Sequence, residues 1–177
     1  MKADALVWYE FLATFNGECY LSETLWMDND RIELFTDSSG NSSLGCGAYF
    51  SGRWVQFKWP SSWVKKDLMS DISFLELVPI LLTMLSWSDQ FKNKKILLRM
   101  DNQALVSIIN KRTSKSKYIM QLIRPFVLMT MNNNTQFKAL HVLGVHNEIA
   151  DALSRFQMNR FRCLAPKVDQ TPSDIPV

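Results

Sequence analysis

The spacing of hydrophobic and polar residues changes twice along the chain. Between residues 32 and 59, apolar residues form short runs or alternate with polar ones, and turn-forming Gly and Ser residues separate the runs. This pattern predicts three consecutive strands in an antiparallel meander, with a hairpin turn at Ser51 and Gly52. Residues 73–88 are apolar on almost every face, so we expect a deeply buried helix that Pro79 kinks by removing one helical hydrogen bond.

The second half of the chain alternates strands with helices. Residues 95–100 form an apolar run typical of a buried strand, and a helix with one apolar face follows. A longer apolar helix ends near residue 131, a strand covers 135–143, and a short helix covers 147–155. The order β-β-β-α-β-α-α-β-α predicts an α/β fold, with a mixed five-stranded sheet of three antiparallel strands and then crossover units, flanked by helices.

Both ends of the chain differ from its centre. Residues 1–16 predict a helix with a broad aromatic surface, which is large for a free terminus, so we expect it to pack on a preceding domain. The last residues contain three prolines, as is typical of a linker or a peeled-off end. We therefore divide the chain into an N-terminal helix and connection (1–31), a central domain (32–158) and a Pro-containing tail (159–177).

Composition is typical of a globular protein of the cell interior. Of the 177 residues 47% are hydrophobic, which is enough for one domain with a substantial core. No apolar run reaches the ~18 residues of a membrane span, and the first residues lack a signal-peptide layout. Three cysteines without paired spacing fit a reducing compartment. We expect an intracellular protein, cytoplasmic or nuclear, that is not secreted and has no membrane partner.

The net charge of +3 is modest, but positive charge is concentrated in the middle of the chain. Residues 92–117 hold eight Lys or Arg and one acid, whereas residues 1–30 hold six acids and one Lys. A basic middle is typical of a surface that faces a polyanion. A solvated face of helices and loops is the alternative interpretation.

Four acids stand where regular elements begin or end, and each has an ordinary structural explanation. Asp37 follows the first strand and could organise an Asx turn. Glu76 lies three residues after Ser73, which is the spacing of a capping box. Asp101 could cap the helix after its strand, and Asp151 could face water from an amphipathic helix.

Taken together, the same four carboxylates predict a metal-dependent site. Asp37 and Asp101 come at the C-terminal ends of strands, where open α/β sheets place ligand crevices. If Glu76 and Asp151 join them in one cleft, the four charges repel one another strongly unless cations are present. Mg²⁺ takes oxygen ligands, and two such ions ~3.5–4 Å apart activate a water and stabilise the leaving oxygen of a phosphodiester. The pattern therefore predicts two-metal phosphodiester hydrolysis.

The four acids lie in short motifs that occur in a fixed order. The motifs are TDSSG at 36–40, FLEL at 74–77, MDNQA at 100–104, and HVLG followed by NEIADALSR at 141–155. Across roughly residues 32–156 this combination resembles the ribonuclease H domain of retroelement reverse transcriptases, with an ending similar to those of long-terminal-repeat and DIRS-type retrotransposons. The resemblance implies a ribonuclease H-like fold and cleavage of the RNA strand of RNA/DNA hybrids during reverse transcription. It also implies that residues 1–31 are the remnant of a polymerase region in cis.

The resemblance further implies roles for individual residues. Two Mg²⁺ ions, for which Mn²⁺ can substitute, would be held by the four acids Asp37, Glu76, Asp101 and Asp151. Three polar residues beside the acids are candidates for contacts to the nucleic-acid backbone or to 2′-hydroxyls: Ser38, Ser39 and Asn102. Four cations of one loop are candidates for holding DNA phosphates, with a solvated loop as the alternative: Lys111, Arg112, Lys115 and Lys117.

Two histidines require separate interpretation. Cellular members of the family carry a His in a longer glycine-containing loop before the last acid, where it is thought to help product release. Here that loop shrinks to residues 144–146, so His146 is a candidate for the role, with an ordinary surface position as the alternative. His141 shares a strand face with Phe137 and Ala139, and we expect it to be a buried, hydrogen-bonded core histidine.

Three functions are compatible with these residues. The first is an active ribonuclease H. The second is a catalytically weak or inactive ribonuclease H-like module that binds nucleic acid or serves as a scaffold in a domesticated element, as the shortened loop suggests. The third is an integrase-like nuclease acting on DNA, although such enzymes usually carry fewer and differently spaced acids.

Overall fold

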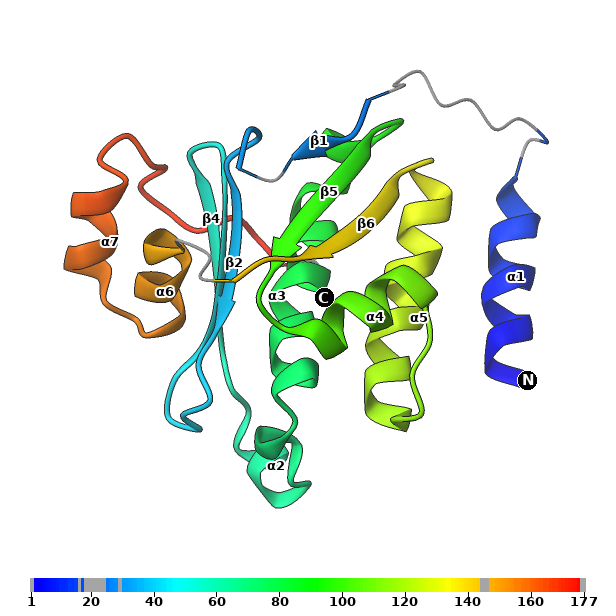
Figure 1. Cartoon of the computed structure of the whole chain (residues 1–177), viewed down its shortest axis with the longest axis horizontal. Helices are drawn as coiled ribbons and strands as arrows, with labels where there is room; N and C mark the ends of the chain where they lie inside the picture. Colours follow the sequence, from blue (N-terminus) through cyan, green and yellow to red (C-terminus); the bar gives the residue numbers. More distant parts are fainter. Residues whose placement is uncertain (1, 16, 18–24, 29, 144–146, 176–177) are drawn as a thin grey trace.

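Parallel and antiparallel strands are both present, and helices flank them (Figure 1). The computed structural model describes residues 2–15, 17, 25–28, 30–143 and 147–175. In the described part of the chain the strands form two three-stranded sheets, ordered β2-β3-β4 and β1-β5-β6. The chain is thus an α/β protein with mixed strand directions.

The antiparallel sheet is the predicted meander. It consists of β2 (Leu34–Ser38), β3 (Gly45–Phe50) and β4 (Arg53–Lys58), with Asp37 opposite Gly47. The β3–β4 hairpin turns through Ser51 and Gly52, both with positive φ (47° and 87°). Positive φ at both central residues is the requirement of the tightest hairpin turn, which glycine satisfies without strain.

The second sheet is parallel. β5 (Lys95–Met100) pairs with β6 (Gln136–His141), and the two-residue β1 (Met27–Asp28) pairs with the start of β5. All five predicted strands are present, but the expected single sheet of five is not seen. β1 lies within a connection that the sequence pattern left irregular, and it occupies the edge of β5 at Ile96 and Leu97.

Three helices pack beside the sheets. They are α3 (Ile72–Trp87), α4 (Gln103–Lys111) and α5 (Lys117–Asn132). As predicted, α3 is deeply buried, and Pro79 lies inside it. By length and composition alone the stretch Ile72–Phe91 is apolar enough to cross a membrane, but 61% of its most apolar window is buried inside this structure, as in the core helix of a soluble fold.

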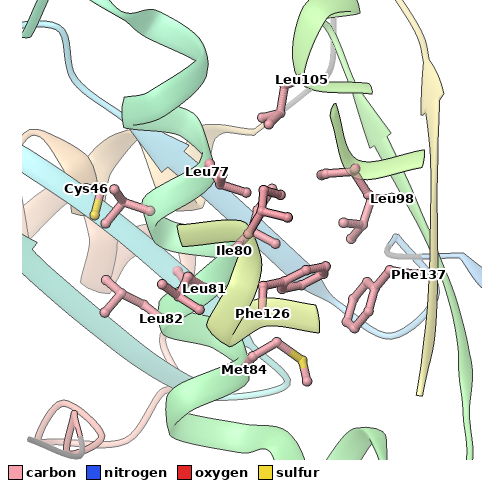
Figure 2. Close-up of a cluster of buried hydrophobic side chains, with 14 of the residues drawn as sticks. Cys46, Leu77, Ile80, Leu81, Leu82, Met84, Leu98, Leu105, Phe126 and Phe137 are labelled. Carbon is pink, nitrogen blue, oxygen red and sulfur yellow. The ribbon is translucent and has the colours of Figure 1, made fainter. Parts of the chain in front are cut away.

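The main core forms around α3 (Figure 2). In Figure 2, Ile80 of α3 and Phe126 of α5 lie next to Leu98 and Phe137, which come from β5 and β6. On the other side of α3 the close-up shows Cys46 of β3. The buried side chains of α3 therefore form one core with residues of both sheets, held together by apolar burial, which is the largest favourable term in folding.

The N-terminal helix is present but has no buried residue. α1 (Lys2–Thr14) contacts α5, and Asp4 Oδ1 pairs with Arg124 Nε at 3.0 Å. Several of its large apolar side chains are exposed: Leu6, Trp8, Tyr9 and Leu12. Packing of this helix on a preceding domain stays a prediction.

Three short α-helices and two 3₁₀ turns complete the part of the chain that the structure describes. α2 (Ser61–Lys65) and two 3₁₀ turns (Leu68–Ser70 and Ser88–Phe91) flank α3. α6 (Glu148–Ser154) is the predicted last helix of the central domain, and α7 (Met158–Leu164) follows it.

The tail after α7 packs against the fold, where the sequence pattern indicated a linker or a peeled-off end. Ala165 and Val168 are buried, and Trp54 Nε1 donates a hydrogen bond to the Asp169 carbonyl at 2.9 Å. Ser173 N donates to the Trp54 carbonyl at 2.7 Å. The tail thus covers the β3–β4 hairpin, and an edge strand covered in this way is protected from pairing with other chains.

We expect Val168→Ala to lower the free energy of unfolding by about 1–2 kcal/mol, because it removes buried methyl groups. The neighbouring Lys167 is exposed, so Lys167→Ala should change stability by less than about 0.5 kcal/mol. Urea denaturation of both variants checks this. Equal, near-zero effects would show that the tail is not part of the folded unit.

Candidate functional site

A pocket of about 120 Å³ opens where the C-terminal ends of β2 and β5 come together beside α3. Figure 1 shows these two strands next to α3, with α6 on the far side of β2. The lining of the pocket includes three of the four predicted acids, Asp37, Glu76 and Asp101. The remaining lining residues are Thr36, Arg99, Met100 and Asn147.

Asp37 is held within β2 rather than in a turn. The turn after it is organised by other groups: Ser39 N donates to the Gly45 carbonyl, and Ser39 Oγ accepts from Asn41 N. The Asx-turn interpretation of Asp37 is therefore wrong. Burial raises the pKa of Asp37, the hydrogen bond from Ser154 opposes the rise, and the charges of Asp151 and Asp101 add to it.

Glu76 lies in the second turn of α3 and does not close a capping box. The residue that caps α3 is Asp71, whose Oδ1 accepts from Phe74 N at 3.0 Å. Ser73 Oγ instead accepts a hydrogen bond from Asn102 Nδ2 at 3.3 Å. Burial raises the pKa of Glu76; a hydrogen bond from Asn102 opposes this, and the charges of Asp101 and Asp37 add to it.

Asp101 follows β5 directly and is exposed at the pocket. It does not cap the next helix, because Asn102 Oδ1 accepts from Leu105 N at 3.0 Å. Asn102 therefore caps α4 and also bonds Ser73, so its side chain is used in positioning the site. His141 Nε2 lies 3.1 Å from the Asp101 carbonyl oxygen.

The expectation that His141 is a core histidine is wrong. The residue is exposed, whereas Phe137 and Ala139 on the same strand face are buried. β6 ends at His141, so the last residue of that face extends past the core. Its hydrogen bond to the backbone of Asp101 nevertheless connects the ends of β5 and β6.

A close contact at Gly47 brings α6 to Asp37. A Cβ atom at Gly47 would lie 2.3 Å from Leu153 Cβ, so only glycine allows the helix to approach β3 this closely. The contact places Ser154 beside β2, where its Oγ donates to Asp37 Oδ2 at 2.5 Å. Ser154 itself is fully buried.

Asp151 is close to the pocket but is not among its lining residues. Its Oδ1 pairs with Arg155 Nε at 2.5 Å, and its Oδ2 pairs with Arg160 Nη1 at 2.6 Å. Burial raises the pKa of Asp151, but the hydrogen bonds and charges of the two arginines outweigh it, so the net shift is downward. Ser154 Oγ, which donates to Asp37 Oδ2, also lies 3.0 Å from the Asp151 carbonyl oxygen, so Asp151 is near Asp37, and its charge raises the pKa of Asp37.

The predicted nucleic-acid contacts are only partly supported by position. Ser38 is partly exposed at the end of β2, but Ser39 is buried, and its carbonyl accepts from Trp59 Nε1. We therefore assign Ser39 a structural role. The four cations at the α4–α5 connection are exposed and do not line the pocket: Lys111, Arg112, Lys115 and Lys117. His146 lies outside the described residues.

Three residues at the site were not predicted. Arg99 lines the pocket, and its Nη2 pairs with Asp28 Oδ2 at 2.6 Å. Asn147 Nδ2 donates to the Thr36 carbonyl at 2.6 Å. The third is Ser154, whose position three residues after Asp151 was a signal in the sequence. The position of Arg99 depends on the pairing of β1 with β5, which no sequence pattern predicts.

The donor atoms at the pocket suit a hard divalent cation. They are carboxylate oxygens together with Oδ1 of Asn147, a buried atom without a hydrogen-bond partner among the described residues. However, no three of the His, Cys, Asp and Glu side chains in the described ranges are placed so that they could hold a metal ion.

We expect Gly47→Ala to destabilise the protein by about 1–3 kcal/mol, because the added methyl group overpacks the contact with Leu153. Gly40→Ala is the matched control, since nothing lies within 4 Å of a Cβ at Gly40. Thermal unfolding compares the two variants. Equal stability would contradict the close approach of α6 to β3.

We expect Glu76→Gln to stabilise the protein in EDTA. The folded-state pKa of Glu76 is raised above its ordinary value of 4.5, so the folded state binds more protons and loses stability as pH rises through the interval above 4.5. The variant removes this loss, so its melting temperature should exceed that of the wild type by about 1–3 °C at pH 7. The difference should vanish near pH 4; a difference independent of pH would contradict the assignment.

Comparison with known proteins finds no family model, no curated protein and no solved structure that matches this chain.

Proposed function

We propose that this chain is a ribonuclease H that hydrolyses the RNA strand of RNA/DNA hybrids during retroelement reverse transcription. The observation that supports it best is the convergence of Asp37, Glu76 and Asp101, from three distant motifs, on one pocket, with Asp151 beside it. The motif order resembles that of retroelement ribonuclease H domains. The finer fold assignment, a ribonuclease H-like arrangement in which the two sheets stand for one sheet of five strands, is part of the same proposal.

The acids are the residues that would hold two Mg²⁺ ions, or Mn²⁺ in their place. Bound metal would activate the attacking water and stabilise the leaving oxygen of the phosphodiester. The raised pKa values of Asp37 and Glu76 support this role, because carboxylates that are partly buried and lie near like charges gain most from a nearby cation. Asp151 would join the set after one of its oxygens leaves an arginine.

Other residues of the chain would position these acids. Ser154 fixes one oxygen of Asp37 through its 2.5 Å hydrogen bond, which leaves the other oxygen for the pocket. Asn102 connects Glu76, Ser73 and the start of α4, so it holds Glu76 next to Asp101. Such support keeps reacting groups in place and avoids reorganisation during the reaction.

Substrate contacts extend the proposal to the surface. Ser38 lies at the pocket end of β2 and would contact the RNA strand, whose 2′-hydroxyls distinguish it from DNA. The exposed cations of the α4–α5 connection would hold phosphates of the DNA strand, a contact that positions the duplex without reading its sequence. The exposed aromatic side chains of α1 would pack against a polymerase region in cis, inside the cell.

Cleavage of a labelled RNA/DNA hybrid in Mg²⁺ tests the proposal. We expect the wild type to cut the RNA strand and Asp101→Asn to lower the rate by about 100-fold or more, because metal ions contribute several kcal/mol to such reactions. EDTA should abolish cleavage and Mn²⁺ should restore it. A wild-type rate of RNA cleavage equal to that of Asp101→Asn would contradict the proposal.

A second candidate function is a ribonuclease H-like module that binds hybrid without cutting it. The observation in its favour is that no group of three or more His, Cys, Asp or Glu side chains within the described ranges is placed to hold a metal ion. Salt-sensitive hybrid binding without cleavage would support this candidate. Preference for duplex DNA over hybrid would point instead to a DNA-processing enzyme.

A further inference from the structure

The corner between α6 and α7 carries two arginines that share one carboxylate. Arg155 Nε and Arg160 Nη1 take the two separate oxygens of Asp151, at 2.5 and 2.6 Å. Arg160 Nη1 also donates to Gln157 Oε1 at 3.0 Å. Both guanidinium groups are on the surface, with 51% and 43% of their side chains exposed, whereas Asp151 is only 28% exposed.

A tight turn places the two arginines on the same side of the corner. Phe156 has a left-handed backbone conformation, with φ of 57°. The turn is held by hydrogen bonds from Phe156 N to the Leu153 carbonyl and from Gln157 N to the Ala152 carbonyl, at 3.0 and 2.9 Å. This reversal brings α7 back toward α6, so that Arg160 reaches Asp151 nine residues earlier in the chain.

The charges at this corner do not balance. Two guanidinium groups face one carboxylate, and an arginine presents several donors in a planar fork, so each retains donors for a second anion. Ser154, the residue before Arg155, donates to Asp37 Oδ2 and so places this corner beside the pocket. Arg160 is among the residues that line a shallow hollow formed by Phe156–Arg160. The surface next to the acidic pocket is therefore positive and open.

We propose that Arg155 and Arg160 bind a backbone phosphate of the nucleic-acid substrate next to the cleaved bond and, in doing so, release Asp151 toward the carboxylate pocket. The inference rests on the proposed function, because it assumes that the pocket takes a phosphodiester. In the structure both oxygens of Asp151 are engaged by arginine, so metal binding by this residue requires that at least one pair breaks. A phosphate suits the exchange, because guanidinium binds phosphate in the same bidentate manner as carboxylate.

The exchange couples two binding events. Substrate provides the arginines with a new anion, which lowers the cost of moving Asp151 to a cation. By thermodynamic linkage, the factor by which bound substrate raises the affinity for metal equals the factor by which bound metal raises the affinity for substrate. The acidic site would be assembled completely only when nucleic acid is present.

Arg160→Gln tests the exchange with two readouts that do not require turnover. In EDTA, fluorescence anisotropy with a labelled RNA/DNA hybrid should show a Kd raised by about three- to tenfold, and the slope of log Kd against log salt should fall by about 1. In the absence of nucleic acid, calorimetric titration with Mn²⁺ should show binding about threefold tighter, because one competitor for Asp151 is gone. A residue that only clamps α7 onto α6 would not produce changes of opposite sign.

Two controls make the result specific. Lys65→Gln removes the same unit of charge from α2, away from this corner (Figure 1), and should change neither affinity. In an Asp151→Asn background, Arg160→Gln should no longer alter Mn²⁺ binding, since the carboxylate it competes for is absent.

Separate outcomes distinguish this inference from the proposed function. If the wild type neither binds nor cleaves hybrid, the proposed function is wrong. If the wild type cleaves hybrid but Arg160→Gln leaves hybrid affinity unchanged, or weakens Mn²⁺ binding, the exchange is wrong and the proposed function stands.

Discussion

Burial of α3 on all its sides is the constraint on which the rest of the structure depends. A helix without a polar face must be covered by other elements around its circumference, and here β2, β3 and β4 cover it on one side while α4 and α5 cover it on the other. Residues of both sheets thereby share one core with this helix. The ends of β2 and β5 then meet beside its first turns, where Glu76 is the acidic side chain that α3 contributes to the pocket.

The same packing produces an electrostatic cost at the site. Asp37 and Glu76 are partly buried near other carboxylates, and the pKa of each is raised by burial first and by neighbouring charge second. Carboxylates buried near one another lower the stability of the folded state, and such arrangements are common at functional sites that use charge. Ser154 and Asn102 reduce the cost without removing it, since each donates a hydrogen bond to one carboxylate.

α6 connects this charged pocket to the surface. Its close approach at Gly47 brings one buried hydroxyl to Asp37, and one turn earlier it carries Asp151. The pKa shifts of Asp37 and Asp151 are opposite because burial dominates at Asp37, whereas at Asp151 the two arginines outweigh the effect of burial. The fourth acid is therefore stable outside the pocket in the absence of a competing anion, and its position depends on what the arginines bind.

The sequence by itself determined the order of the main elements, but not β1, α2 or α7, because the apolar periods of the longer strands and helices are local properties that burial enforces. The meander, the buried helix, the parallel strands and the four acids at element ends follow from it.

Only the tertiary structure decided which strands pair with one another and which polar residues cap the helices. The two-residue β1, whose pattern is too short to predict a strand, pairs with the start of β5, and the strands form two sheets instead of the expected five-stranded one. Asp71 caps α3 where Ser73 was predicted to, and Asn102 caps α4 where Asp101 was predicted to, because the backbone geometry at the helix start decides which of several neighbouring polar side chains can reach the free N–H groups. The packed tail, exposed His141 and paired Asp151 likewise depend on contacts between distant segments, for which local spacing carries no information.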